Sequence, residues 1–148
     1  MSNLLVQTIK HTNNTTSMSI NTSGQVSIRG ESSATTTNLQ QGLAKHWTSI
    51  DGSGTVSLPD SFNTSGLTDV GTGNYQPAFT NNMNNSDYSV QLTSSVDHGV
   101  GFFFACVGDT SGLYPPPSTS NYQIFNSYTG TSINDSDNLY GTVHGDLA

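Results

Sequence analysis

Basic residues are scarce in this sequence. Its 148 residues include only three Lys and Arg against ten Asp and Glu, which gives a formal net charge of −7. Proteins that bind nucleic acids or anionic membranes neutralise phosphates with clustered cations. The three cations, Lys10, Arg29 and Lys45, lie far apart in the sequence. We therefore expect no nucleic-acid partner and no membrane insertion.

Cysteine and long apolar runs are also nearly missing. Cys106 is the one cysteine, so no intramolecular disulfide framework can form, and we expect a buried, inert thiol. No apolar run approaches the roughly 18 residues that a membrane-spanning helix needs. Residues 1–9 show no basic segment followed by a long apolar one, as a secretory signal would. We expect a soluble protein made inside a cell.

Small polar residues dominate what is present. Ser, Thr, Asn and Gly supply close to half of the chain, and only 9% of residues are charged and 32% hydrophobic. Disordered chains usually combine high charge with few aromatic residues, whereas this chain keeps six Tyr, six Phe and Trp47. We expect one folded domain with a thin core. Identical neighbours can complete such a core, so we also expect oligomerisation.

Apolar residues alternate with polar ones in short segments separated by Gly, Asn and Ser, which predicts an all-β chain. Regular short strands with turns between them favour an antiparallel β-sandwich, of jelly-roll type, over residues 38–148. The expected strands are Thr55–Leu58, Asn74–Phe79, Tyr88–Leu92, Gly101–Val107, Tyr122–Phe125 and Leu139–His144.

The N-terminal residues 1–30 read as a separate β segment. Met18 and Ile20 alternate with polar residues, as do Val26 and Ile28, which predicts a hairpin with one apolar side. An isolated hairpin is marginal in water, so this segment needs a surface to lie on. We expect it to act as an anchor, with a polar linker at residues 31–37. Its candidate contact residues are Leu5, Val6, Ile9, Met18 and Ile20.

The stretch after the linker allows two interpretations. Asn38–Trp47 is the one place where a helical turn could form, although Gly42 weakens it. Ala44–Ile50 fits a first strand equally well, with Trp47 supplying part of the core.

Motifs for catalysis and cofactor binding are missing from the sequence. The histidines His11, His46, His98 and His144 stand in no nucleophile, nucleotide-binding or zinc-binding motif. Asp51, Asp60, Asp69 and Asp109 adjoin Gly, Ser or Thr, which favours turns over a carboxylate pair. Residues 134–138 space oxygen ligands like the start of a calcium loop, but an Asx-rich turn explains them more simply. We expect neither an enzyme nor a cofactor.

Four tyrosines, Tyr114, Tyr122, Tyr128 and Tyr140, are candidates for stacking on a carbohydrate, and the loops around Tyr114 and Tyr128 are the expected receptor contacts. Tyr114 precedes Pro115–Pro117, a stiff segment that cannot join a ladder and belongs at a surface. Tyr128 begins a polar stretch before Asp137. Aromatic rings in such loops could stack on a host surface glycan, although tyrosine in strands more often packs structurally.

Several stretches resemble phage tail-fibre-like virion structural proteins, especially those of viruses of marine bacteria and cyanobacteria. The stretches are Leu5–Lys10, Thr16–Gly24, Gly42–Trp47, Asp51–Val56, Asp60–Asn63, Asp69–Tyr75, Asn85–Val90 and, less closely, Asp135–Asp146. Residues 96–120 are only weakly similar.

The resemblance implies a location and an assembly class, and it transfers no active site. It implies a homotrimer in the virion, made in the host cytoplasm, that forms a short tail or neck fibre anchored by its N-terminus. The portal, adaptor, tail or capsid proteins would be its partners. The alternatives are a capsid decoration or head fibre protein and a module that binds a host glycan.

Overall fold

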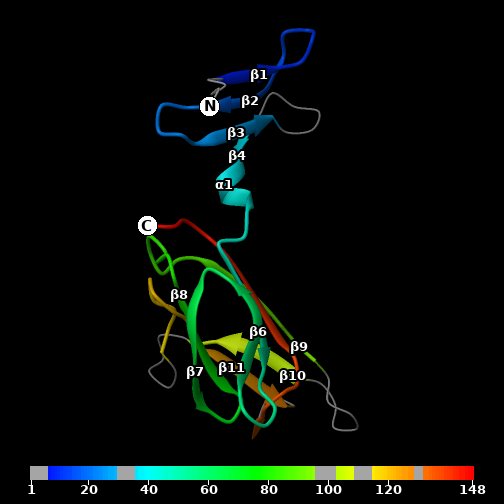
Figure 1. Ribbon diagram of the computed structural model, residues 1–148, viewed down its shortest axis with the longest axis vertical. Coiled ribbons are helices and arrows are strands. Elements are labelled where there is room, and N and C mark those ends of the chain that lie inside the picture. Colours follow the sequence, from blue (N-terminus) through cyan, green and yellow to red (C-terminus); the bar gives the residue numbers. More distant parts are fainter. Residues whose placement is uncertain (1–6, 30–35, 96–102, 109–114, 129–131) are drawn as a thin grey trace, which may run out of the picture. The chain divides into compact units, whose positions relative to one another are not determined.

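The computed structural model describes residues 7–29, 36–95, 103–108, 115–128 and 132–148. The chain divides into two compact units, Met1–Leu43 and Ala44–Ala148. Short strands form the regular structure of both units, and Leu39–Gly42 (α1) is the one helix of the described residues (Figure 1). The prediction of an all-β chain is confirmed.

The first unit is a four-stranded antiparallel sheet. Its strands lie in chain order: β1 (Thr8–Lys10), β2 (Thr16–Ile20), β3 (Val26–Arg29) and β4 (Thr36–Asn38). The predicted hairpin is present, because Met18 pairs with Ile28 and Ile20 with Val26. Its turn is closed by the Asn21 side chain, whose Oδ1 accepts hydrogen bonds from the backbone N–H groups of Ser23 and Gln25.

The division between the units falls after Leu43, whereas the sequence suggested a linker at 31–37 and a domain from 38. Thr36–Asn38 pairs with β3, so the end of that polar stretch is a strand. Asn38 then caps α1, since its Oδ1 accepts a hydrogen bond from the Gln40 N–H. Both interpretations of the next stretch hold in part: a helical turn forms first, and a strand begins at His46.

The second unit contains two antiparallel sheets. The first has the order β6-β5-β13-β9, and the second has the order β10-β11-β8-β7, with β12 paired to β11. The strand bounds are β5 His46–Asp51, β6 Ser57–Phe62, β7 Thr64–Gly71, β8 Asn74–Phe79, β9 Ser89–Ser94, β10 Phe103–Val107, β11 Ile124–Tyr128, β12 Ser132–Ile133 and β13 Leu139–His144.

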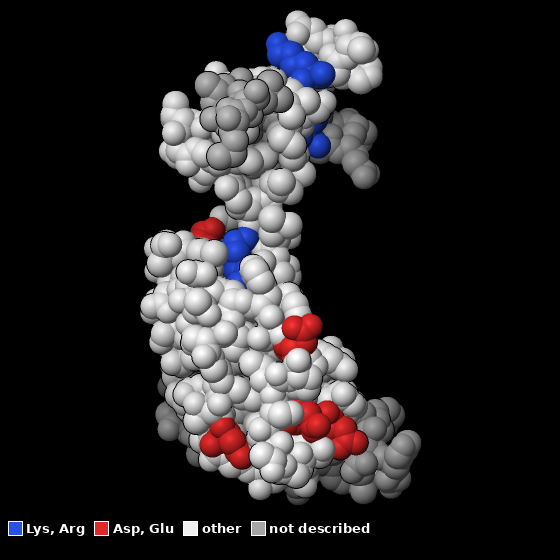
Figure 2. Space-filling model, in the orientation of Figure 1, with Lys and Arg blue, Asp and Glu red and all other residues white. Residues whose placement is uncertain are grey.

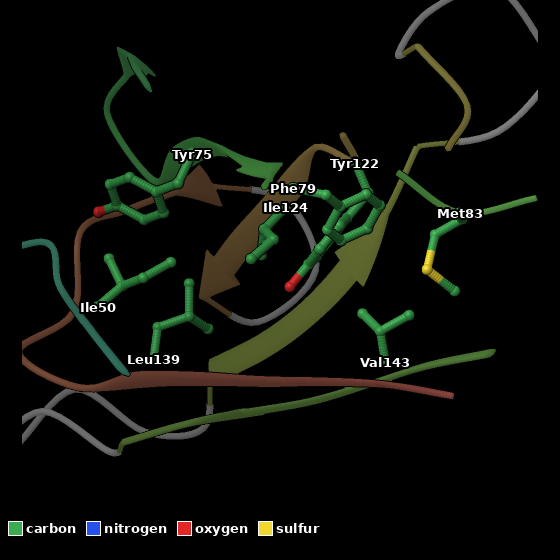
Figure 3. Close-up of a cluster of buried hydrophobic side chains, with 8 residues drawn as sticks. All are labelled: Ile50, Tyr75, Phe79, Met83, Tyr122, Ile124, Leu139 and Val143. Atoms are coloured by element: carbon green, nitrogen blue, oxygen red, sulfur yellow. The ribbon is translucent and has the colours of Figure 1, made fainter. Parts of the chain in front are cut away.

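One cluster of buried side chains joins these two sheets. Figure 3 shows the side chains of Ile50, Leu139 and Val143 pointing toward those of the other sheet. The remaining members are Tyr75, Phe79, Met83, Tyr122 and Ile124. Burying a large apolar side chain contributes about 1.5–3 kcal/mol, so this cluster is the main source of stability in the second unit.

The chain crosses between the two sheets several times, and the crossing from β6 to β7 is made by one residue, Asn63. Asn63 has a positive φ, a left-handed conformation that Asn tolerates better than most residues. Its amide Nδ2 donates to the carbonyl oxygens of Lys45 and Asn81, and its Oδ1 accepts from the Asn81 N–H. The side chain therefore ties the sheet crossing to two neighbouring segments.

Two predictions about side-chain burial are wrong. Cys106 is exposed, because Ala105 and Val107 take the core-facing positions of β10 and Cys106 points the other way. Trp47 is exposed on β5, where His46 and Thr48 face inward instead. Successive residues of a strand face opposite sides of the sheet. Assigning one residue of a strand to the wrong side therefore assigns all its other residues wrongly as well.

Candidate binding surfaces

The sheet of the first unit carries an apolar face, here called the N-terminal apolar face. Ile9 pairs with Met18, Met18 with Ile28 and Ile20 with Val26, so all five side chains share one side of the sheet. Ile9 is 50% exposed and Ile20 is 36% exposed. None of the described residues of this unit is buried. The sheet therefore offers apolar area that the described residues of the unit leave exposed.

Three of the predicted anchor residues, Ile9, Met18 and Ile20, lie together on this face. Leu5 and Val6 lie outside the described residues. The sequence prediction did not include Val26 and Ile28 among the contact residues, although the alternation that placed them in the hairpin also puts them on this side.

The second unit carries an aromatic face on the outer side of the sheet β6-β5-β13-β9. Trp47 pairs directly with Phe62 on one neighbouring strand, and Tyr140 lies diagonally across on the other strand, opposite Ser49. The exposed fractions are 36% for Trp47, 51% for Phe62 and 48% for Tyr140. Cβ atoms of directly opposed residues lie about 4.5–5.5 Å apart and diagonal neighbours about 7–8 Å, so the three rings form one patch.

Polar side chains surround these rings on the same side of the sheet. Asp60 pairs with Ser49, Thr93 pairs with Tyr140, and Gln91 pairs with Thr142. The Nδ1 atom of His144 lies 3.0 Å from Oε1 of Gln91, which holds both side chains in place. None of the four strands contains Lys or Arg. The face therefore combines rings with hydrogen-bonding groups. Its strands contain no cationic residue, and Lys45, which directly precedes β5, is buried.

Beneath this sheet lies a buried polar group centred on His46. Its Nε2 lies 3.0 Å from Oγ1 of Thr64 and its Nδ1 lies 3.5 Å from the Tyr122 hydroxyl. Its ring meets Phe79 edge-on, with the centroids 4.9 Å apart. Burial lowers the pKa of His46 to about 4, because the charged imidazolium is poorly solvated there. His46 is therefore a neutral core residue at pH 7.

Residues 134–138 form an irregular loop between β12 and β13, held in place by Asp135. Asp135 Oδ1 accepts hydrogen bonds from the Gly73 N–H (2.6 Å) and from the Tyr75 hydroxyl (2.7 Å). Burial, together with this carboxylate, raises the pKa of Tyr75. Gly73 has a positive φ, and a Cβ there would lie 2.5 Å from the Asn134 carbonyl oxygen, so glycine is needed. Within the described part of the chain, no group of three or more His, Cys, Asp or Glu could hold a metal ion.

Among the tyrosines suggested for carbohydrate stacking, Tyr140 is exposed on β13, whereas Tyr122 is fully buried in the core and cannot contact a receptor. Tyr114 lies outside the described residues. The backbone of Tyr128 ends β11 and pairs with Phe103, while its side chain lies outside the description. Pro115 and Pro116 are exposed and belong to no strand, as expected.

Two findings bear on what kind of protein this is. No helix in the described residues is both long enough and apolar enough to cross a membrane. No protein-family model, curated protein sequence or solved structure matches the chain. Inferences about function therefore rest on the sequence resemblance and on the chemistry of the N-terminal apolar face and the aromatic face.

Proposed function

We propose that this chain is a structural protein of a bacteriophage particle, a short trimeric appendage of the tail or neck. The N-terminal unit attaches it to the particle, and the second unit is a β-sandwich of jelly-roll type with no catalytic role. The virion assignment rests on the sequence resemblance. The attachment role rests on the N-terminal apolar face.

That face carries the proposal because a single sheet needs something against which to pack. Ile9 and Ile20 remain exposed, and no described residue of the unit is buried. Single-layer β elements are marginal in water unless their apolar side is covered. Obligate subunit interfaces supply such cover, since they resemble a domain core cut in half. A copy of the chain or another virion protein would complete this unit.

The second unit supports the sandwich assignment through its shared core. Ile50 and Leu139 come from one sheet and Ile124 from the other, yet all three belong to one buried cluster. Two antiparallel sheets that bury a common set of side chains are typical of a β-sandwich.

The assembly role is tested by placing one charge on either side of the same strand. Ile20→Asp puts a carboxylate on the N-terminal apolar face, and the matched control Ser19→Asp puts one on the opposite side of β2, where Ser19 pairs with Thr8 and Ser27. We expect Ile20→Asp to dissociate a trimer measured by native mass spectrometry, while Ser19→Asp leaves it intact. A monomeric parent chain, or a trimer unaffected by Ile20→Asp, would contradict assembly through this face.

The location is tested separately by immunogold labelling of intact particles with antibodies against the full chain. Label at the tail or neck supports the proposal. Label over the head would favour the alternative of a capsid decoration or head fibre protein. Absence of label, with accessible epitopes confirmed, would contradict the virion assignment.

A further inference from the structure

We propose that the aromatic face of the second unit, formed by Trp47, Phe62 and Tyr140 with their polar neighbours, binds a neutral oligosaccharide. Of its three rings, only Tyr140 was suggested from the sequence for carbohydrate stacking. The proposal does not depend on the virion assignment, because it concerns the chemistry of one described sheet face.

The arrangement of the rings suits a sugar. A pyranose presents C–H groups on its flat faces and hydroxyl groups around its rim, so it packs on an aromatic ring and needs polar partners beside it. Trp47 and Phe62 are direct neighbours across β5 and β6, and Tyr140 continues the patch on β13. Regular strands hold all three, which fixes their spacing better than loops would.

The polar side chains of the face can form hydrogen bonds with the hydroxyl groups of a sugar. One carboxylate oxygen of Asp60 accepts a hydrogen bond from the Ser61 N–H. A carboxylate has two acceptor oxygens, so Asp60 can also accept hydrogen bonds from sugar hydroxyl groups. Gln91 and His144 hold each other at 3.0 Å, which reduces the conformational freedom lost on binding. Thr93 adds a hydroxyl next to Tyr140. Donors and acceptors therefore flank the rings.

The charge of the face selects a neutral ligand. Asp60 is acidic, and β5, β6, β9 and β13 contain no Lys or Arg to pair with a carboxylate, sulfate or phosphate. Lys45, which directly precedes β5, is buried. An anionic glycan would meet like charge without compensation. A neutral sugar carries no such penalty.

The size of the face argues against a protein partner. Each of the four strands has six residues. At about 4.8 Å between strands and about 3.4 Å per residue, the face measures roughly 19 by 20 Å, or about 400 Å². Stable protein interfaces bury about 800 Å² of accessible surface on each partner, so a protein partner would have to extend beyond these four strands. A short oligosaccharide matches the smaller area.

Trp47 makes the test direct, because it is the one tryptophan of the chain and lies in the patch. The full chain is titrated with cellotriose, maltotriose, mannotriose and triacetylchitotriose while its emission and iodide quenching are recorded. We expect at least one sugar to change the emission saturably and to protect Trp47 from iodide. If none does so, the proposal is overturned.

Variants then locate the site by calorimetric titration with the active sugar. Phe62→Ala and Tyr140→Ala each remove one ring of the patch, and we expect each to weaken binding about tenfold. Phe104→Ala is the matched control, since Phe104 is a 60% exposed aromatic residue on the other sheet. It should leave the affinity unchanged. Equal effects of all three variants, with circular dichroism unchanged, would overturn the proposal.

If the aromatic face instead mediates self-association, Trp47 should be protected from iodide without any sugar. Trp47 would then be protected from iodide at high protein concentration and become accessible on dilution. That result would also overturn the proposal.

Discussion

The two units of this chain are built from similar residues but are stabilised differently. Both are rich in Ser, Thr and Asn and consist of short antiparallel strands. The second unit buries eight hydrophobic side chains in a cluster shared by its two sheets. The described part of the first unit buries none. The difference shows that strand pairing alone gives a sheet, whereas a second layer makes that sheet a self-sufficient domain.

Charge separates the units as well. Lys10 and Arg29 against Glu31 give residues 1–43 a formal charge of +1, while Lys45 against nine aspartates gives residues 44–148 a formal charge of −8. In the view of Figure 2, acidic side chains are spread over the second unit, and the first shows basic side chains. Strong negative charge keeps a protein soluble and opposes random association. The first unit, nearly neutral and partly apolar, is the better suited of the two to assembly.

The largest expected effect comes from removing a core side chain in the second unit. Leu139 is fully buried, and Leu139→Ala should lower the free energy of unfolding by about 2–5 kcal/mol. Ile28 is only half-buried in the first unit, and Ile28→Ala should cost about 1 kcal/mol or less in the isolated chain. Urea unfolding followed by Trp47 fluorescence reports the second unit, and hydrogen exchange of peptides within 7–29 reports the first. If Leu139→Ala and Ile28→Ala lowered the free energy of unfolding by similar amounts, the two units would not be stabilised differently.

Acidification should destabilise the second unit through His46. Its folded pKa of about 4 lies below the ordinary value of 6.5, so the unfolded chain binds a proton first as the pH falls. The stability that depends on a neutral His46 is complete above pH 6.5 and is lost progressively between pH 6.5 and pH 4. With allowance for solvent screening, the loss reaches about 2–3 kcal/mol in more acidic solution. Urea unfolding across this range should show the loss in the parent chain. The free energy of unfolding should depend less on pH in His46→Gln, whereas the control His144→Gln should keep the pH dependence of the parent chain.

Much of the fold could be predicted from the alternation of apolar and polar residues. The predicted bounds of β8 and β13, Asn74–Phe79 and Leu139–His144, are confirmed, because both strands alternate cleanly. The strand β7 was missed. Thr64–Gly71 is mostly polar, and within it only Leu67 packs against the core. A strand that buries one side chain leaves little pattern to detect.

The faces of the strands were harder to predict than their positions. Residues 102–107 are almost continuously apolar, so periodicity could not decide that Cys106 faces outward. His46 and Trp47 are adjacent, and hydrophobicity favoured the tryptophan for the core. The structure buries the histidine, whose ring nitrogens find partners in Thr64 and Tyr122. Of the aromatic face, only Tyr140 was named from the sequence as a possible stacking residue, and Trp47 and Phe62 were missed. The polar residues that follow Trp47, Thr48 and Ser49, are the main sequence signal for its exposure.

The smallest expected effect compares two asparagines with left-handed backbones, one in each unit. Asn14 and Asn63 both have positive φ, so glycine fits both positions without backbone strain. Asn14→Gly removes one exposed hydrogen bond, which Lys10 Nζ donates to Asn14 Oδ1. This change should alter the free energy of unfolding by a few tenths of a kcal/mol at most. Asn63→Gly removes the bonds to Lys45 and Asn81 at the crossing between sheets. Losing these partly buried bonds should cost about 1 kcal/mol or more. Thermal unfolding of each variant measures the difference. Equal and negligible effects would show that backbone conformation alone accounts for asparagine at both positions.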